Sequence, residues 1–129
     1  GRVILRTPSR ESGYIAMDKN GSWIAVVGGD IYRNGVKILR TPYRHSGGVA
    51  MDEKGNWVAV AGGNVYRNGV VIFTTNFTAS GGITMDKNGD WLAVIGGDLY
   101  RNGQKVVTTA GRYSGGVAMV DKDNWYAVM

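Results

Sequence analysis

The chain has 129 residues with no Cys and one His, and 15 Lys or Arg against 10 Asp or Glu give a formal charge of +5. This length indicates one domain, and the missing Cys excludes disulfides, thiol catalysis and zinc ribbons. A hydrophobic content of 43% excludes a disordered chain. No apolar run approaches the ~20 residues that span a bilayer, so we expect no membrane span.

A repeat of 34 residues organises the sequence. Trp23 and Trp57 are separated by one period (57 − 23 = 34), and the same step leads to Trp91 and Trp125. Met17 begins an equally spaced series of Met residues. A fixed period of this size is typical of solenoids and propellers. We expect a single repeat domain, with repeat boundaries near 1–12, 13–46, 47–80, 81–114 and 115–129.

Each copy predicts four short strands, and the second copy illustrates them. The first three strands are apolar runs too short for helices, and the fourth is rich in β-branched residues. Acidic or Gly-rich turns separate them, and Asn68-Gly69 is the pair favoured in two-residue type I′ hairpins. The strands are expected at residues 49–51, 57–61, 65–67 and 70–75. Each copy is therefore predicted to be an antiparallel four-stranded meander.

The predicted fold is all-β: a β-propeller built from four such repeats. The second strand is apolar at consecutive positions, as in Ile24–Val27, so both of its faces should be covered. Lys37 and Lys105 lie in the fourth strand, as expected for an outer strand. Radial stacking of sheets satisfies both patterns. The last repeat is interrupted after its second strand, and we expect the N-terminal strand (Arg2–Thr7) or a partner chain to complete it.

The repeat unit resembles known lectin repeats. Copy two reads Val49-Ala-Met-Asp-Glu-Lys-Gly-Asn-Trp-Val-Ala-Val-Ala-Gly-Gly-Asn-Val-Tyr-Arg-Asn-Gly69 and is similar to repeats of tectonin and tachylectin-like β-propeller lectins. This resemblance implies a propeller that binds carbohydrate. A second reading compares Asp52-x-Lys54-x-Asn56-x-Val58 with the sugar-binding box of monocot mannose lectins, which have a β-prism fold.

The residues that recur in every copy favour structural roles. Turn Asp residues such as Asp52 are expected to accept hydrogen bonds from their own turn, and the Lys residues beside them disfavour a calcium loop. The Trp series is expected to pack in the core, with the Met series as filler. Arg33, Arg67 and Arg101 are expected to be exposed or to pair with an acidic residue of a neighbouring blade.

The links between repeats differ most from copy to copy, and loops carry function more readily than the scaffold does. They offer aromatic faces and hydrogen-bond donors that suit sugar hydroxyls. Six candidate ligand-binding residues lie there: Tyr43, Arg44, His45, Phe77, Arg112 and Tyr113. His45 is the only His, and no Ser or acidic partner set recurs around it, so we expect no enzyme. We also expect no cofactor and no metal site.

The sequence therefore predicts a non-enzymatic, carbohydrate-binding propeller with several equivalent weak sites. The alternative is a structural subunit that forms rings or filaments by strand-edge pairing. The similarity of the copies fits recent duplication as well as a designed or reconstructed repeat protein. Dispersed basic residues argue against a specific nucleic-acid partner. A lectin or a filament would favour an extracellular or cell-surface location.

Overall fold

A computed structural model of the chain describes residues 1–7, 13–41, 46–76, 80–109 and 115–129. In this part of the chain there are fourteen strands and no helix. Three sheets are four-stranded meanders and the fourth has two strands, so the predicted all-β repeat fold is confirmed. The sheets comprise β1 (Gly13–Met17), β2 (Trp23–Val27), β3 (Asp30–Arg33) and β4 (Val36–Arg40); β5 (Ser46–Met51), β6 (Trp57–Ala61), β7 (Asn64–Arg67) and β8 (Val70–Thr74); β9 (Ser80–Met85), β10 (Trp91–Ile95), β11 (Asp98–Arg101) and β12 (Gln104–Thr108); and β13 (Gly116–Asp121) with β14 (Asn124–Val128).

The turns follow from residues that tolerate positive φ. Asn68 and Gly69 have φ values of 49° and 90°, which is the type I′ geometry that Asn-Gly favours. The Asn side chain closes the hairpin, because its Oδ1 accepts a hydrogen bond of 2.9 Å from the Trp57 backbone N–H. A second clamp follows the fourth strand, where the Thr75 hydroxyl donates to the Gly63 carbonyl at 2.8 Å. Both contacts recur in the other four-stranded sheets.

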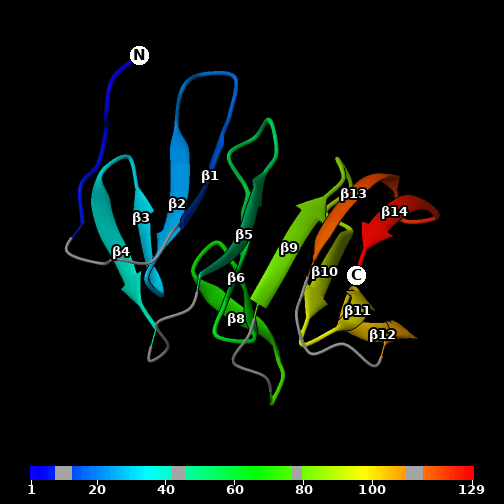
Figure 1. Cartoon of the computed structure of the whole chain (residues 1–129). Coiled ribbons are helices and arrows are strands. Elements are labelled where there is room, and N and C mark those ends of the chain that lie inside the picture. The colour runs from blue at the N-terminus through cyan, green and yellow to red at the C-terminus, as the bar shows by residue number, and fades with distance from the viewer. Residues whose placement is uncertain (8–12, 42–45, 77–79, 110–114) are drawn as a thin grey trace.

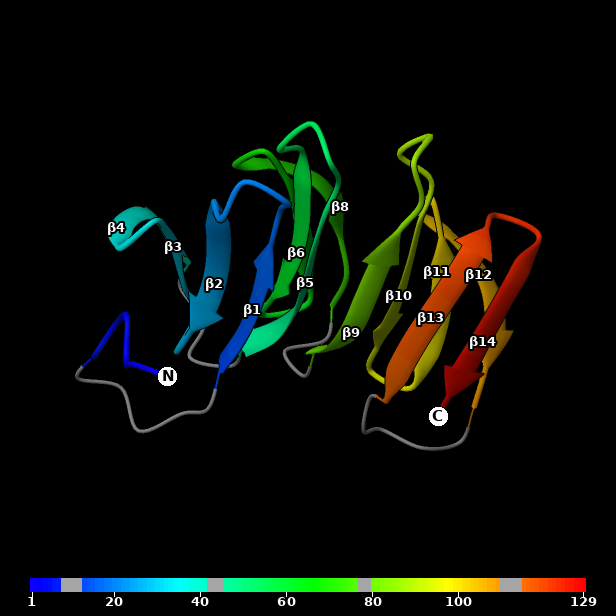
Figure 2. The ribbon, with the colours of Figure 1, turned by 90° about the horizontal axis from the view of Figure 1, so that it is seen from above.

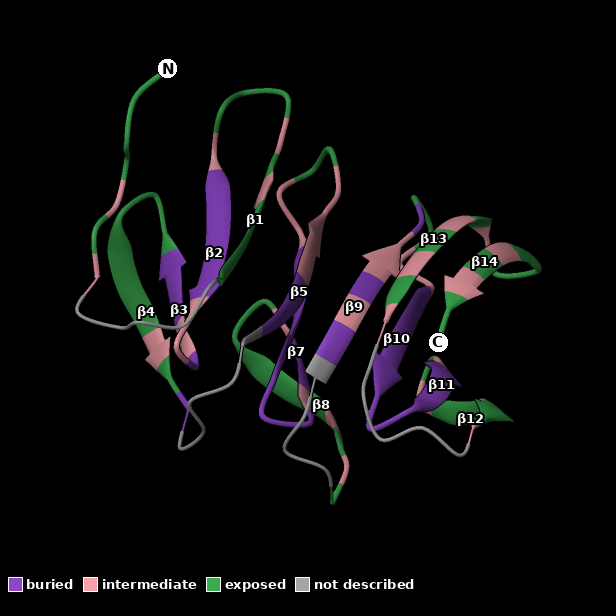
Figure 3. Cartoon of the chain, viewed as in Figure 1, coloured by how far each residue is buried: buried purple, intermediate pink, exposed green. Residues whose placement is uncertain are grey.

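The sheets follow one another as the blades of an open arc (Figures 1 and 2). Their first strands are neighbours: β1 contacts β5, β5 contacts β9, and β9 contacts β13. Glycines allow this approach, because a Cβ on Gly48 would lie 2.9 Å from the Ile83 nitrogen and 3.1 Å from the Gly82 Cα. The fourth strands β4, β8 and β12 lie on the outer side and are largely exposed (Figure 3).

The core lies between adjacent blades, so each four-stranded sheet buries its central strands on two faces. One face of the second strand packs forward against the next blade, and the opposite face packs back against the previous one. Between the second and third blades, the forward side supplies Val58, Val60 and Val65, and the backward side supplies Ile83, Trp91, Ala93, Ile95 and Tyr100. The same pattern joins the first and second blades.

The expectation that the N-terminal strand completes the last repeat is wrong for this structure. Residues 1–7 form no strand, and five of them line a cavity on the backward face of the first blade instead. Leu5 packs there against the buried cluster of Trp23, Ala25 and Tyr32. The physical reason is that this face is apolar and that no other blade among the described residues covers it. Within the described residues, β14 has β13 as its one hydrogen-bonded neighbour.

Candidate functional site

The six ligand-binding residues predicted from the links all lie outside the described residues. Tyr43, Arg44 and His45 belong to the segment 42–45, Phe77 belongs to 77–79, and Arg112 and Tyr113 belong to 110–114. Their assignment therefore stays a prediction. The described residues do show the structural roles of the Trp, Met, Asp and Arg residues that recur from repeat to repeat. They also line two cavities.

The recurring Trp residues pack in the core, as predicted. Trp23, Trp57 and Trp91 are buried, and each belongs to a hydrophobic cluster. Trp125 is partly buried and packs on the forward face of the third blade. The Met series is less uniform, because Met17 is exposed whereas its equivalent Met85 packs against the core. Among the described residues, no neighbouring blade packs on the side of the first blade that carries Met17, and this explains the difference.

The recurring Asp residues organise their own turns, which is also the predicted role. The Asp52 Oδ1 accepts backbone hydrogen bonds from Lys54 at 2.9 Å and Asn56 at 2.9 Å. Asp18, Asp86 and Asp121 accept equivalent bonds in their hairpins. The turn residues are thus engaged in local backbone bonding, the usual role of Asp in turns.

Two of the three recurring Arg residues tie adjacent blades together. Arg67 Nη2 donates to the Gly89 carbonyl at 2.9 Å, in the first hairpin of the next blade. Arg101 donates to the Lys122 carbonyl at 3.3 Å and lies 3.8 Å from the Asp123 carboxylate. Arg33 is exposed. Arg33 and Arg101 agree with the expected structural roles, whereas Arg67 contacts a backbone carbonyl instead of an acidic side chain.

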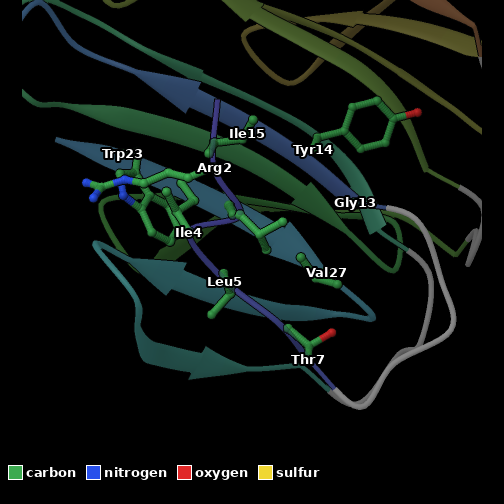
Figure 4. A pocket seen from close by; sticks show the side chains of 11 residues that line it. Arg2, Ile4, Leu5, Thr7, Gly13, Tyr14, Ile15, Trp23 and Val27 are labelled. Atoms are coloured by element: carbon green, nitrogen blue, oxygen red, sulfur yellow. The ribbon is translucent and has the colours of Figure 1, made fainter. Parts of the chain in front are cut away.

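The first cavity, of about 370 Å³, lies between the N-terminal segment and the first blade. Figure 4 shows the segment from Arg2 to Thr7 crossing the strand that carries Trp23 and Val27, while the Tyr14 ring points away from the cavity. The walls of this first cavity are mainly apolar and include Ile4 and Leu5. A mainly apolar wall provides few groups for orienting a polar ligand.

The second cavity, of about 250 Å³, lies between the β5–β6 hairpin and the β9–β10 hairpin. Both hairpins contribute a Met, an Asp and a Lys, and the β5–β6 hairpin adds Glu53. Each hairpin follows the last residue of its first strand, β5 or β9. The cavity therefore lies at the end of the sheets where these two strands finish, opposite to their first residues, Ser46 and Ser80.

Asp86 is the unusual residue of the second cavity. Its side chain is buried, with 7% of the residue exposed, and Oδ1 accepts hydrogen bonds from the Asn88 and Asp90 backbone. Oδ2 is buried and has no hydrogen-bond partner among the described residues. Sequence reasoning missed this site. The signal was present at position 90, where Asp replaces the Asn56 of the second copy.

Electrostatic shifts cluster on the same turns and on the outer strands. Partial burial opposes ionisation of Asp52, but hydrogen bonds from Asn56 and Lys54 outweigh it and lower the pKa. Hydrogen bonds from Asn124 and Asp123 likewise lower the pKa of Asp121. On the third blade, the Asp98 carboxylate, 3.1 Å from the Lys105 Nζ, raises the pKa of that ammonium.

The described residues contain neither a cluster of metal-ligating side chains nor a membrane-spanning helix. Within them, no three His, Asp or Glu side chains gather as a metal site. No helix in the same part of the chain is long and apolar enough to cross a membrane. The second cavity does offer hydrogen-bonding groups. Asp86, in its wall, has a carboxylate oxygen that is unpaired among the described residues, and Lys54 and Lys87 line the same cavity.

Comparison with known proteins supports the fold. No family model matches the sequence, and no curated protein matches it. Among solved structures, virginiamycin B lyase from Staphylococcus aureus superposes with a TM-score of 0.58 and 15% sequence identity. The match covers 86% of this chain and 47% of that chain, so the protein spans about half the length of that structure. At this identity the likeness shows a β-propeller-like fold alone, and the tectonin type stays a prediction.

Proposed function

We propose that the protein is a non-enzymatic carbohydrate-binding module with several weak sites at the links between blades. The observation that carries this proposal is how the recurring residues are used. The Trp residues fill the core, the Asn residues close hairpins, and the Asp residues organise turns. Residues that vary between copies are not required by this scaffold. The varied links contain the aromatic and basic side chains suited to sugars.

Binding without catalysis fits these observations better than an enzyme does. The neighbouring structure is that of a lyase, and the likeness to it extends only to the fold. Propeller folds host many functions, so the activity of a structural neighbour carries little weight. Several repeated sites of low affinity would gain strength through avidity on a multivalent glycan.

A glycan array tests this proposal. We expect the wild-type chain to bind at least one glycan class, and we expect Tyr43→Ala and Tyr113→Ala to weaken that binding about tenfold or more. The control is Lys19→Ala, which removes an exposed side chain from a hairpin at the other end of the first blade. Absence of binding by the wild-type chain at high concentration would refute the proposal.

Self-assembly is a second candidate, and one observation favours it. On the outward face of β13–β14, Val120, Tyr126 and Val128 are 78%, 80% and 75% exposed. Leu92 and Val94, the equivalents of Tyr126 and Val128, are fully buried against the fourth blade. We propose that a second copy covers this face and pairs with the edge of β14.

Light scattering coupled to size-exclusion chromatography tests the second candidate. We expect the 129-residue chain to elute above monomer mass at micromolar concentration, and Val128→Ser with Tyr126→Ser to return it to monomer mass. Val70→Ser changes another exposed Val, 65% exposed on the outer strand β8, and as the control it should leave the mass unchanged. A strictly monomeric wild-type chain contradicts this candidate.

A further inference from the structure

The wall of the second cavity includes Asp86, which has one carboxylate oxygen that the protein itself does not satisfy. This oxygen, Oδ2, is buried without a partner among the described residues. A buried acceptor without a donor bears an uncompensated desolvation cost, and such a group calls for an explanation, for example a bound water or ligand. A cavity of about 250 Å³ is much larger than the ~30 Å³ share of a single water.

One substitution between copies explains the missing donor. In the second blade, Asn56 Nδ2 donates to Asp52 Oδ2 at 3.0 Å, while Asn56 Oδ1 accepts from Asn68 Nδ2 at 3.1 Å. In the third blade, Asp90 takes the place of Asn56 and accepts from Asn102 Nδ2 at 2.9 Å. An ionised Asp has no N–H to donate in return. The Oδ2 of Asp86 therefore receives no hydrogen bond of the kind that Asn56 donates to Asp52.

The charges around the cavity select the chemistry of the ligand. Lys54 and Lys87 line it together with Asp52, Glu53 and Asp86, so charges of both signs surround the cavity and neither a cation nor an anion suits all of them. Hydroxyl groups satisfy both kinds of side chain, because they donate to carboxylates and accept from ammonium groups. The Met side chains of the two hairpins add apolar surface beside these charges.

We propose that this cavity binds a single neutral polyhydroxylated ring, such as a monosaccharide, with a ligand hydroxyl donating to Asp86 Oδ2. The site shares its ligand class with the proposed function but none of its residues. Arg67 preorganises it, since its bond to the Gly89 carbonyl fixes the third-blade hairpin against the second blade. The cavity volume lies just below the ~300 Å³ lower bound of drug-sized sites, which suits one ring.

Nuclear magnetic resonance titration with monosaccharides tests the site directly. The reporters are the backbone amides of Asn88 and Asp90, because both donate to Asp86 Oδ1. With glucose, galactose, mannose, N-acetylglucosamine and inositol as probes, we expect at least one to shift these two amides saturably. Shifts that stay absent for all five probes mean that the cavity holds water only, and they overturn the proposal.

Two variants separate ligand binding from a merely structural role of Asp86. Asp90→Asn supplies the amide that Asn56 supplies in the second blade, so it should raise the unfolding midpoint and weaken ligand binding at least tenfold. Asp86→Asn replaces the acceptor by a donor and should weaken binding similarly. The matched control is Ser22→Asn, which makes the corresponding change in the first blade, away from the cavity, and should leave binding within about twofold. A more stable Asp90→Asn variant that binds like the wild type overturns the proposal.

The outcomes also separate this site from the sites at the links. Array binding that depends on Tyr43 and Tyr113, with no shift at Asn88 and Asp90, supports the proposed function and overturns the second-cavity site. Shifts at Asn88 and Asp90 that Tyr43→Ala leaves intact support the second-cavity site, whether or not the array shows binding.

Discussion

At the scale of single residues, the same turn position has different chemistry in different copies. Asp52 has both carboxylate oxygens satisfied, because Asn56 follows it in the turn. Asp86 has one oxygen satisfied, because Asp90 follows it. A single exchange of Asn for Asp thus converts a closed structural turn into one with an open acceptor. The two turns can be compared directly within one protein, because their backbone hydrogen bonds to the Asp side chain are alike.

The lowered pKa of Asp52 predicts a pH dependence of stability. Its folded pKa lies below the ordinary value of 3.8, so the unfolded chain binds the proton first as the pH falls. The stabilisation is complete well above the unfolded value of 3.8, and it is lost as the pH falls below that value and through the folded pKa. We expect Asp52→Asn to be less stable at neutral pH and to lose less stability over this fall in pH than the wild type does.

Urea unfolding at a series of pH values measures this effect. The slope of unfolding free energy against pH is not lost entirely in the variant, because Asp121, whose pKa is also lowered, still contributes to it. Glu53→Gln changes an exposed carboxylate in the same turn and serves as the control, with an unchanged slope expected. Equal slopes for Asp52→Asn and the wild type would show that the turn hydrogen bonds do not stabilise the ionised form.

At the scale of elements, the sequence predicts most of what the structure contains. Strands expected at 57–61 and 65–67 are observed as β6 and β7 with bounds within one residue, because short apolar runs between strong turn signals leave little freedom. The Asn68-Gly69 hairpin is confirmed by its two positive φ values. The Thr75 clamp on Gly63 was not predicted, because a Thr at a strand end carries no distinctive pattern.

The last repeat shows where element prediction was insufficient. Its first turn is a tighter hairpin, in which Asp121 pairs with Asn124 after a register shift that follows Met119. The copies look equivalent in spacing, but Val120 displaces the turn Asp by one position. The candidate cavity was missed for a related reason: it needs two hairpins of different blades to meet, and local patterns do not encode that contact.

At the scale of the whole molecule, burial depends on which blade a residue belongs to. The copies share one hydrophobic pattern, and each blade packs forward on the next. The repeat pattern alone therefore predicts the core positions, but it does not predict which copies lack a covering blade. Ile15 and Ile83 illustrate this, because they occupy the same repeat position and are 53% and 7% exposed.

This pair gives a matched test of blade packing. Ile83 lies in the cluster that joins the second and third blades, so Ile83→Ala should cost about 2–5 kcal/mol of unfolding free energy. Ile15→Ala makes the same chemical change where no blade covers the side chain, and we expect a loss well below that range, since exposed substitutions usually lie within about 0.5 kcal/mol. Urea unfolding followed by Trp fluorescence measures the total loss of unfolding free energy in each variant. Hydrogen exchange shows in which blade that stability is lost, because repeat proteins open locally. If the two variants lose equal stability, packing between blades does not set the cost, and the open-arc arrangement of the first blade would be contradicted.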